Sequence, residues 1–229
     1  MQSGYKVVVL ARDPAKMLIP EGSGGDKANQ LLVNPNLKIV QGDVTKQASV
    51  DAVFDAADDI SGVIVTLGGK TKDVGPTMLT DGSRCIINAM KRKNQAKRIA
   101  VMTSIGTGNS ERQAPLFFKA LMYTVMKNIF VDKNNQEKLF TEPNGPGHDL
   151  EYCIVRPGGL GKGPATGVIN VIDGQAGSIQ RADVASFCLG AVCDDNFPYL
   201  RKTPCISSIG GTGWKKEPEK GFDNVKTLD

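Results

Sequence analysis

The chain has 229 residues, the size of one ordinary α/β domain, and its 40% hydrophobic and 23% charged residues are typical of a globular protein. A net charge of +4, spread along the chain without a basic stripe among aromatic residues, argues against a nucleic-acid partner. No apolar run approaches the roughly 18 residues that a membrane-spanning helix needs. Five scattered cysteines with no Cys-x-x-Cys pair predict reduced thiols in an intracellular, cytoplasmic protein.

Strand and helix patterns alternate along the sequence. In chain order they are a strand at 4–11, a strand at 37–40, a helix that Thr45 would cap and that runs to residue 57, an apolar strand at 62–67, a helix at 76–94, a strand at 98–102, a helical region at 115–140 interrupted near Asn134 and Asn135, a strand at 151–155 and a helix at 181–193. This alternation predicts an α/β fold with a parallel sheet. We expect one domain at residues 1–208 and a polar, mobile tail at 209–229.

Residues that follow the strands carry most of the functional information, because parallel sheets bind ligands at the carboxyl ends of their strands. Arg12 follows the first strand pattern. An arginine there favours NADP, because its guanidinium can pair with a 2′-phosphate, but a surface arginine before a turn is an equal alternative. Asp43 follows the second strand pattern, where a carboxylate can accept from an adenine amino group while Val44 lends its backbone. Its alternative role is to cap the next helix.

Three more polar or small residues stand at strand ends. Gly68 and Gly69 let the backbone approach a ribose or a phosphate closely, although paired glycines also form ordinary turns. Ser104 could contact a nicotinamide or a substrate carbonyl, or it could cap a turn. The single histidine, His148, has no second ligand at a useful spacing, so no metal site is predicted.

The first strand pattern has the features of the second strand of a nucleotide-binding βαβ unit. A strand, a glycine-rich loop and a helix normally precede such a strand, and no Gly-x-Gly-x-x-Gly fingerprint follows a strand in this sequence. We therefore expect a sheet that lacks its first β-strand and first helix. We also expect an upstream segment of roughly 25–30 residues that encodes them, where an organelle-targeting peptide would also lie.

Together these strand ends resemble the atypical short-chain dehydrogenase/reductases, in particular their single-domain NAD(P)H-binding group, which includes NmrA-like proteins and flavin/biliverdin reductases. The resemblance covers residues 4–192. Its motifs are Val9-Leu10-Ala11-Arg12-Asp13-Pro14, Gly42-Asp43-Val44, Asp81-Gly82-Ser83-Arg84, Thr103-Ser104, Asp132-Lys133 with Glu137, Ile154-Val155-Arg156-Pro157-Gly158-Gly159-Leu160 and Arg181-Ala182-Asp183-Val184-Ala185. It implies a Rossmann-like, doubly wound parallel sheet, truncated at its N-terminus, that binds NADP(H).

The resemblance also implies roles for individual residues. Arg12 would contact the 2′-phosphate, and Asp43 with Val44 would lie at the adenine. Other cofactor contacts would come from Leu67, Gly68 and Gly69 at the adenosine ribose and phosphates, and from Thr103, Pro157, Gly158 and Gly159 at the nicotinamide. Ser104 and Lys133 are the candidate catalytic residues.

The sequence departs from the family pattern at two places. Tyr123 and Lys127 fit the Tyr-x-x-x-Lys pattern in which tyrosine is the general acid, but the register aligns Lys133, followed by Glu137, with the family lysine and places Ile129 at the tyrosine position. The loop after the Arg-Pro strand also lacks the histidine of flavin/biliverdin reductases, which argues against a tetrapyrrole substrate.

These departures favour a particular kind of acceptor. Hydride transfer to a flavin or quinone needs no proton donor on the protein, because the cofactor carries the chemistry. We therefore expect an oxidoreductase that passes hydride from NADPH to a small planar acceptor. The alternatives are a non-catalytic NADP(H)-sensing or scaffolding protein, or a fragment unable to bind cofactor. The oligomeric state stays open.

Overall fold

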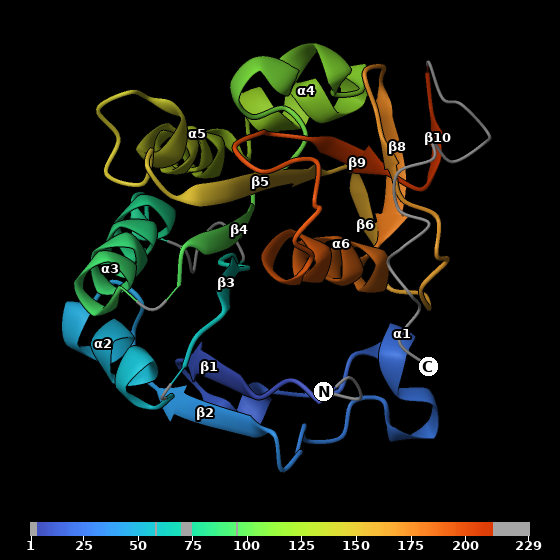
Figure 1. The fold of residues 1–229 in the computed structure, drawn as a ribbon. Helices are drawn as coiled ribbons and strands as arrows, with labels where there is room; N and C mark the ends of the chain where they lie inside the picture. The colour runs from blue at the N-terminus through green and yellow to red at the C-terminus, as the bar shows by residue number, and fades with distance from the viewer. Residues whose placement is uncertain (1–3, 58, 70–74, 95, 213–229) are drawn as a thin grey trace.

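The computed structural model describes residues 4–57, 59–69, 75–94 and 96–212 (Figure 1). Strands and helices alternate over most of this length. In chain order they are β1 Val7–Ala11, α1 Glu21–Gly24, β2 Leu37–Gln41, α2 Gln47–Asp55, β3 Gly62–Val65, α3 Met78–Lys93, β4 Arg98–Met102, α4 Leu116–Tyr123, α5 Lys127–Thr141, β5 Glu151–Pro157, β6 Gly159–Gly161, β7 Asn170–Val171, β8 Ala176–Gln180, α6 Arg181–Cys193, β9 Cys205–Ser207 and β10 Ile209–Gly211.

The described strands form three sheets. The largest has the order β3-β4-β5-β9-β7, in which β3, β4, β5 and β9 are parallel and β7 is antiparallel. A second sheet is the parallel pair β1-β2, and a third has the order β10-β8-β6. The predicted α/β fold with parallel strands is confirmed, but β1 and β2 are not hydrogen-bonded to the large sheet.

Helices cover both faces of the large sheet, as expected when strands are apolar on both sides. Alternate residues of β5 point to opposite layers. Tyr152 and Ile154 pack in the cluster that includes residues of α2, α3 and α5, whereas Cys153 and Val155 pack in the cluster that includes residues of α6. In Figure 1, α3 and α5 lie on one side of β4 and β5, and α6 lies on the other.

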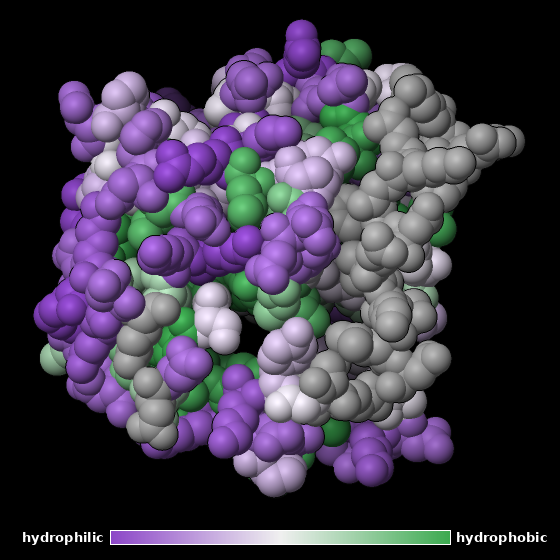
Figure 2. Space-filling view, in the orientation of Figure 1, coloured by the Kyte–Doolittle hydropathy of each residue, from purple (hydrophilic) through white to green (hydrophobic). Residues whose placement is uncertain are grey.

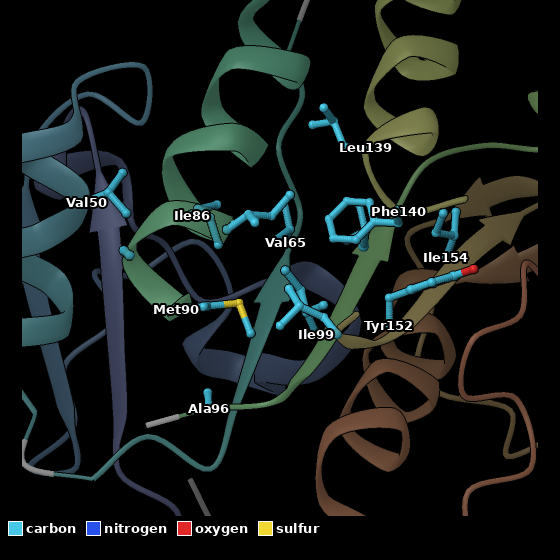
Figure 3. Close-up of a cluster of buried hydrophobic side chains, with 14 of the residues drawn as sticks. Val50, Val65, Ile86, Met90, Ala96, Ile99, Leu139, Phe140, Tyr152 and Ile154 are labelled. Carbon is cyan, nitrogen blue, oxygen red and sulfur yellow. The ribbon is translucent and has the colours of Figure 1, made fainter. Parts of the chain in front are cut away.

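Figure 3 shows the first of these clusters. Phe140 of α5 is fully buried, and its ring centroid lies 5.8 Å from that of Tyr152. Ile99 and Val101 of β4 are 1% and 0% exposed. This layer fixes β4 and β5 against α3 and α5, so the carboxyl ends of these strands are held rigidly.

The structure corrects three expectations about local structure, namely the break in the helical segment, the cap of α2 and the start of the tail. The helical segment predicted at 115–140 is interrupted at residues 124–126, between α4 and α5, and not at Asn134 and Asn135. At Thr124 the backbone departs from helical geometry, with φ −112° and ψ −95°. Thr45 does not cap α2, because its hydroxyl and amide both bind Asp43 and the N-cap position is Lys46. In the predicted tail, Ile209–Gly211 form β10, and residues 213–229 lie outside the described residues.

All five cysteines are free, which agrees with the expected thiols. Burial raises the pKa of Cys188 to about 12, so its thiol stays protonated. None of the helices in the described ranges is long and apolar enough to cross a membrane.

Candidate functional site

A hollow of about 480 Å³ lies at the carboxyl ends of β1, β2 and β3. It is lined by Leu10, Arg12, Gly42, Asp43, Val44, Thr45, Thr66, Leu67, Gly68, Gly75, Thr77, Met78 and Asp81. Five residues predicted from the sequence therefore meet here although they come from three separate strand ends. The size of the hollow is that of a small-molecule site.

Asp43 is held in a tight turn at the end of β2. Its Oδ1 accepts the Thr45 backbone N–H and the Thr45 hydroxyl, each at 2.9 Å. These bonds lower the pKa of Asp43 below its usual value, so the carboxylate is charged at neutral pH. Both bonds use Oδ1, which leaves Oδ2 able to accept a further donor from a ligand.

Arg12 lies directly beyond β1 on the same rim. Its side chain is exposed, and within the part of the chain that the structure describes its guanidinium forms no ion pair. Arg12 lowers the pKa of Asp43 slightly through its charge. The hollow thus carries an arginine that is free to bind an anion beside a carboxylate that can accept from an amino group.

The helix end that borders this hollow is already occupied by a protein group. Asp132 of α5 caps α3: its Oδ2 accepts the Leu79 N–H at 2.7 Å and its Oδ1 accepts the Thr80 N–H at 3.0 Å. Asp132 is 1% exposed. The first amides of α3 are therefore satisfied and do not form an open anion site.

A second polar cluster lies beyond β4 and β5, away from the hollow. The Glu137 carboxylate, 3% exposed, binds the Arg156 guanidinium through both oxygens, at 3.1 and 2.5 Å. Glu137 also accepts the hydroxyls of Thr103 and Thr107, at 2.7 and 2.5 Å. This network ties α5 to the ends of both strands.

Lys133 is part of the same buried layer. Its Nζ donates to the backbone carbonyl of Thr103 at 3.0 Å. Burial lowers the pKa of Lys133 to about 8, and the charges of Glu137 and Asp132 oppose that shift. The structure therefore places this predicted catalytic residue against backbone, where it holds the turn that carries Ser104.

The predicted nicotinamide side is formed by two adjacent strand ends. The Ile105 N–H donates to the Pro157 carbonyl at 3.0 Å, so the Thr103–Ser104 turn lies beside the Pro157–Gly158–Gly159 turn. A Cβ atom on Gly158 would come within 2.3 Å of the Gly177 carbonyl oxygen, so packing against β8 already requires a glycine there. Gly158 thus has a structural role, whatever it binds.

Apolar side chains connect the hollow with the turn that carries Ser104. Leu67 and Met78 line the hollow and also pack in the cluster that contains Ile105, next to Ser104. The predicted residue Gly69 follows Gly68 but does not line the hollow. Asp81 and Met78 also line the hollow. Neither their place there nor the cap by Asp132 could be predicted from the sequence, because only the fold brings α3 against α5 and against Val44.

The residues present fit one end of a dinucleotide better than the other. Arg12, Asp43 and Val44 offer an anion partner, an acceptor and an apolar contact, as the 2′-phosphate and adenine would need. A Cβ on Gly68 would meet nothing within 4 Å, so there is room beside it. In the described ranges, however, the helix N-terminus that borders the hollow is capped by Asp132, so its amides are not free to bind a pyrophosphate.

Comparison with known proteins gives a consistent result. The model of a family described as NAD(P)H-binding matches residues 1–195. Among solved structures, the oxidoreductase ylbE from Lactococcus lactis superposes with a TM-score of 0.66 at 20% identity, covering 90% of this chain and 81% of that one. A putative NAD-dependent epimerase/dehydratase from Bacillus halodurans gives 0.62 at 20% identity, covering 90% and 84%.

A third solved structure is slightly more similar in sequence. ChuY from Escherichia coli O157:H7, an anaerobilin reductase, has a TM-score of 0.57 at 26% identity, covering 79% of this chain and 78% of its own. These likenesses confirm the Rossmann-like fold and the resemblance to NmrA-like and biliverdin reductase-like oxidoreductases.

Proposed function

This chain belongs to the NAD(P)H-binding family, and we propose that it is an NADP(H)-dependent reductase of a small planar acceptor. The single observation that carries the proposal is the hollow in which Arg12, Asp43 and Leu67 meet. When bound, NADPH supplies the hydride, and the residues of this chain hold and orient the cofactor and the acceptor.

The preference for NADP(H) over NAD(H) rests on Arg12. A guanidinium binds a phosphate with two charge-assisted hydrogen bonds, worth about 1.5–3 kcal/mol together with the charge attraction. Asp43 in turn accepts from the adenine amino group with its free oxygen. Loss of the arginine contact should therefore weaken NADPH about 10- to 100-fold and leave NADH nearly unchanged.

The acceptor would lie against the turns after β4 and β5. Ser104 is half-buried there and can donate to a carbonyl of the acceptor, while Lys133 acts as a positioning residue through the Thr103 carbonyl. The apolar side chains of Leu67 and Met78, which line the hollow, suit a flat, conjugated ring. Flavins and quinones have this shape.

The surroundings of Tyr123 support an acceptor that needs no proton donor. Tyr123 is 59% exposed, ends α4 and donates to Glu111, whereas Lys127 begins α5 after a break in the helix. The Glu111 contact raises the pKa of Tyr123. These two residues therefore do not share a helical face as Tyr-x-x-x-Lys requires. The same observation keeps a non-catalytic NADP(H) sensor as the second candidate.

The test is turnover of NADPH and NADH with flavin, quinone and biliverdin acceptors, with direct cofactor titration in parallel. We expect NADPH oxidation with at least one flavin or quinone, and a 10-fold or greater loss of NADPH affinity in Arg12→Gln. The matched control is Arg112→Gln, an exposed arginine outside the hollow. Cofactor binding without turnover of any acceptor would select the sensor instead. A cytoplasmic location and the absence of a nucleic-acid partner belong to the same proposal.

A further inference from the structure

The helix α4 presents an apolar face to solvent. Its exposed positions fall on one side of the helix and carry only apolar or aromatic side chains, namely Leu116, Phe117, Ala120 and Tyr123. Leu116 and Phe117 are 81% and 77% exposed, and Val125, in the break that follows α4, is 69% exposed. In Figure 2, hydrophobic (green) atoms reach the surface among hydrophilic (purple) ones at the top of the molecule, where α4 lies in Figure 1.

The helix α3 shows that this pattern is unusual within the molecule. A surface helix normally turns its polar face to water. The exposed positions of α3 follow that rule and carry only polar side chains, namely Asp81, Arg84, Asn88, Lys91, Arg92 and Lys93. The outer face of α4 therefore has the composition of a surface that another partner covers.

The inner face of α4 fixes the helix in this orientation. Phe118 and Met122 pack in the cluster that contains Ile105 and Phe130. The ring centroids of Phe118 and Phe130 lie 5.8 Å apart in an edge-to-face contact. Since one side of α4 is already packed in the core, its exposed apolar side is a second, separate apolar surface.

A groove of about 590 Å³ beside Leu116 brings positive charge to this surface. Arg112 and Lys119 line the groove, and Asp173 is the acid that lines it. None of these three side chains forms an ion pair within the ranges that the structure describes. Glu111, a neighbouring acid, accepts a tyrosine hydroxyl. The groove thus combines a net positive charge with an apolar border.

We propose that α4 and the groove beside it dock on a membrane surface that contains anionic lipids. Leu116 and Phe117 enter the boundary between the headgroups and the acyl chains, and the groove receives the phosphate of a lipid headgroup beside Lys119. The helix lies on the membrane and does not cross it, in keeping with its eight residues. The inference does not depend on cofactor binding.

Lys119 favours a membrane over a second copy of this chain. It is the charged residue of α4, three positions after Leu116 and four before Tyr123, so it borders the apolar face along its length. A protein–protein contact on this face would take an unpaired ammonium group out of water, which is unfavourable. A headgroup layer keeps the ammonium hydrated while the methylene groups of the lysine lie among apolar groups.

The first experiment measures co-sedimentation of the 229-residue chain with phosphatidylcholine vesicles, with and without about 30% phosphatidylserine. We expect binding to the anionic vesicles. Leu116→Ser and Phe117→Ser should each weaken it about 10-fold, because each removes an apolar side chain that leaves water on docking. Lys119→Gln should weaken binding to the anionic vesicles about 5-fold and leave binding to neutral vesicles unchanged.

The matched control is Val33→Ser, which should bind like the wild type. Val33 is 79% exposed and lies before β2, at the opposite end of the molecule from α4 (Figure 1). Circular dichroism shows that each variant is folded. No binding by the wild type, or equal losses in Val33→Ser and Phe117→Ser, would overturn the proposal. A dimer that forms without vesicles and is lost in Phe117→Ser would identify a second copy as the partner and would overturn it too.

The second experiment reports where the helix lies in the bilayer. Phe117→Trp and, as its control, Val33→Trp are each made in a Trp214→Phe background, so that each protein has one tryptophan. Vesicles with brominated acyl chains should quench the tryptophan at position 117 and leave the one at position 33 unchanged, because only the first reaches the acyl boundary. Bound protein in which neither tryptophan is quenched, or in which both are quenched equally, would refute docking through α4.

Discussion

Replacing Glu137 with glutamine tests the buried network that fixes the ends of β4 and β5. The substitution keeps the size of the side chain but removes its charge. It also turns one acceptor oxygen into a donor, which then faces either the Arg156 guanidinium or a threonine hydroxyl. Arg156 is 3% exposed, so water cannot solvate its charge in place of Glu137.

The expected cost can be estimated from the contacts. Glu137 accepts four hydrogen bonds, two of them from Arg156 at 3.1 and 2.5 Å. Removing one partner of a buried ion pair costs about 3–5 kcal/mol, because the remaining charge is left uncompensated. That is a large part of the roughly 5–15 kcal/mol by which domains are stable.

Urea unfolding followed by circular dichroism measures this cost. With a slope of about 2 kcal/mol per molar urea, the midpoint of Glu137→Gln should fall by about 1.5–2.5 M. The control is Glu151→Gln, which removes a partly exposed partner of Arg98 and should cost less than about 1 kcal/mol. Equal, small effects of the two substitutions would refute the assignment of Glu137 and Arg156 as a buried, mutually dependent pair.

Three further predictions concern single residues. Burial lowers the pKa of Lys133 to about 8 from 10.5, so between these pH values the unfolded chain binds more protons than the folded chain and the free energy of unfolding rises with pH. In urea titrations from pH 8 to 10.5, the free energy of unfolding of the wild type should rise by about 3 kcal/mol relative to that of Lys133→Met. A difference between the two proteins that stays constant with pH would contradict this. Gly158→Ala should lower the free energy of unfolding by about 1–3 kcal/mol, because its Cβ would overlap the Gly177 carbonyl. Gly68→Ala, the control, should change it by no more than about 0.5 kcal/mol. Thermal unfolding compares the two variants, and equal costs would disprove the packing role of Gly158. Tyr123→Phe should leave reductase turnover within twofold, and a loss of 100-fold or more would restore tyrosine as the proton donor.

The strands, and the strand-end residues that line the hollow, could be predicted from the sequence because both depend on local patterns. β4 is found where the apolar run predicted it, and Arg12 and Asp43 meet because residues that follow parallel strands converge at one edge of a sheet. Lys133 and Glu137 both contact Thr103 in one buried cluster, and the sequence did not indicate their burial.

Features that depend on long-range packing could not be predicted in this way. The break at Thr124 lies between two stretches with good helical periodicity, and only the packing of α4 and α5 distinguishes it from Asn134, whose side chain accepts the Gly108 N–H. The cap of α3 by Asp132 joins residues 53 positions apart. β10 was missed because three residues with two glycines give no strand pattern.

The most direct test of the central claim, that the hollow binds a 2′-phosphorylated adenosine, uses a ligand that has no pyrophosphate bridge. Adenosine 2′,5′-bisphosphate and adenosine 5′-monophosphate are titrated into the 229-residue chain while backbone amide shifts are followed by NMR. We predict shifts at Arg12, Asp43 and Leu67, at least 10-fold tighter binding of the bisphosphate, and loss of that difference in Arg12→Gln. Equal affinities for the two nucleotides in the wild type, or shifts confined to residues outside the hollow, would contradict the account.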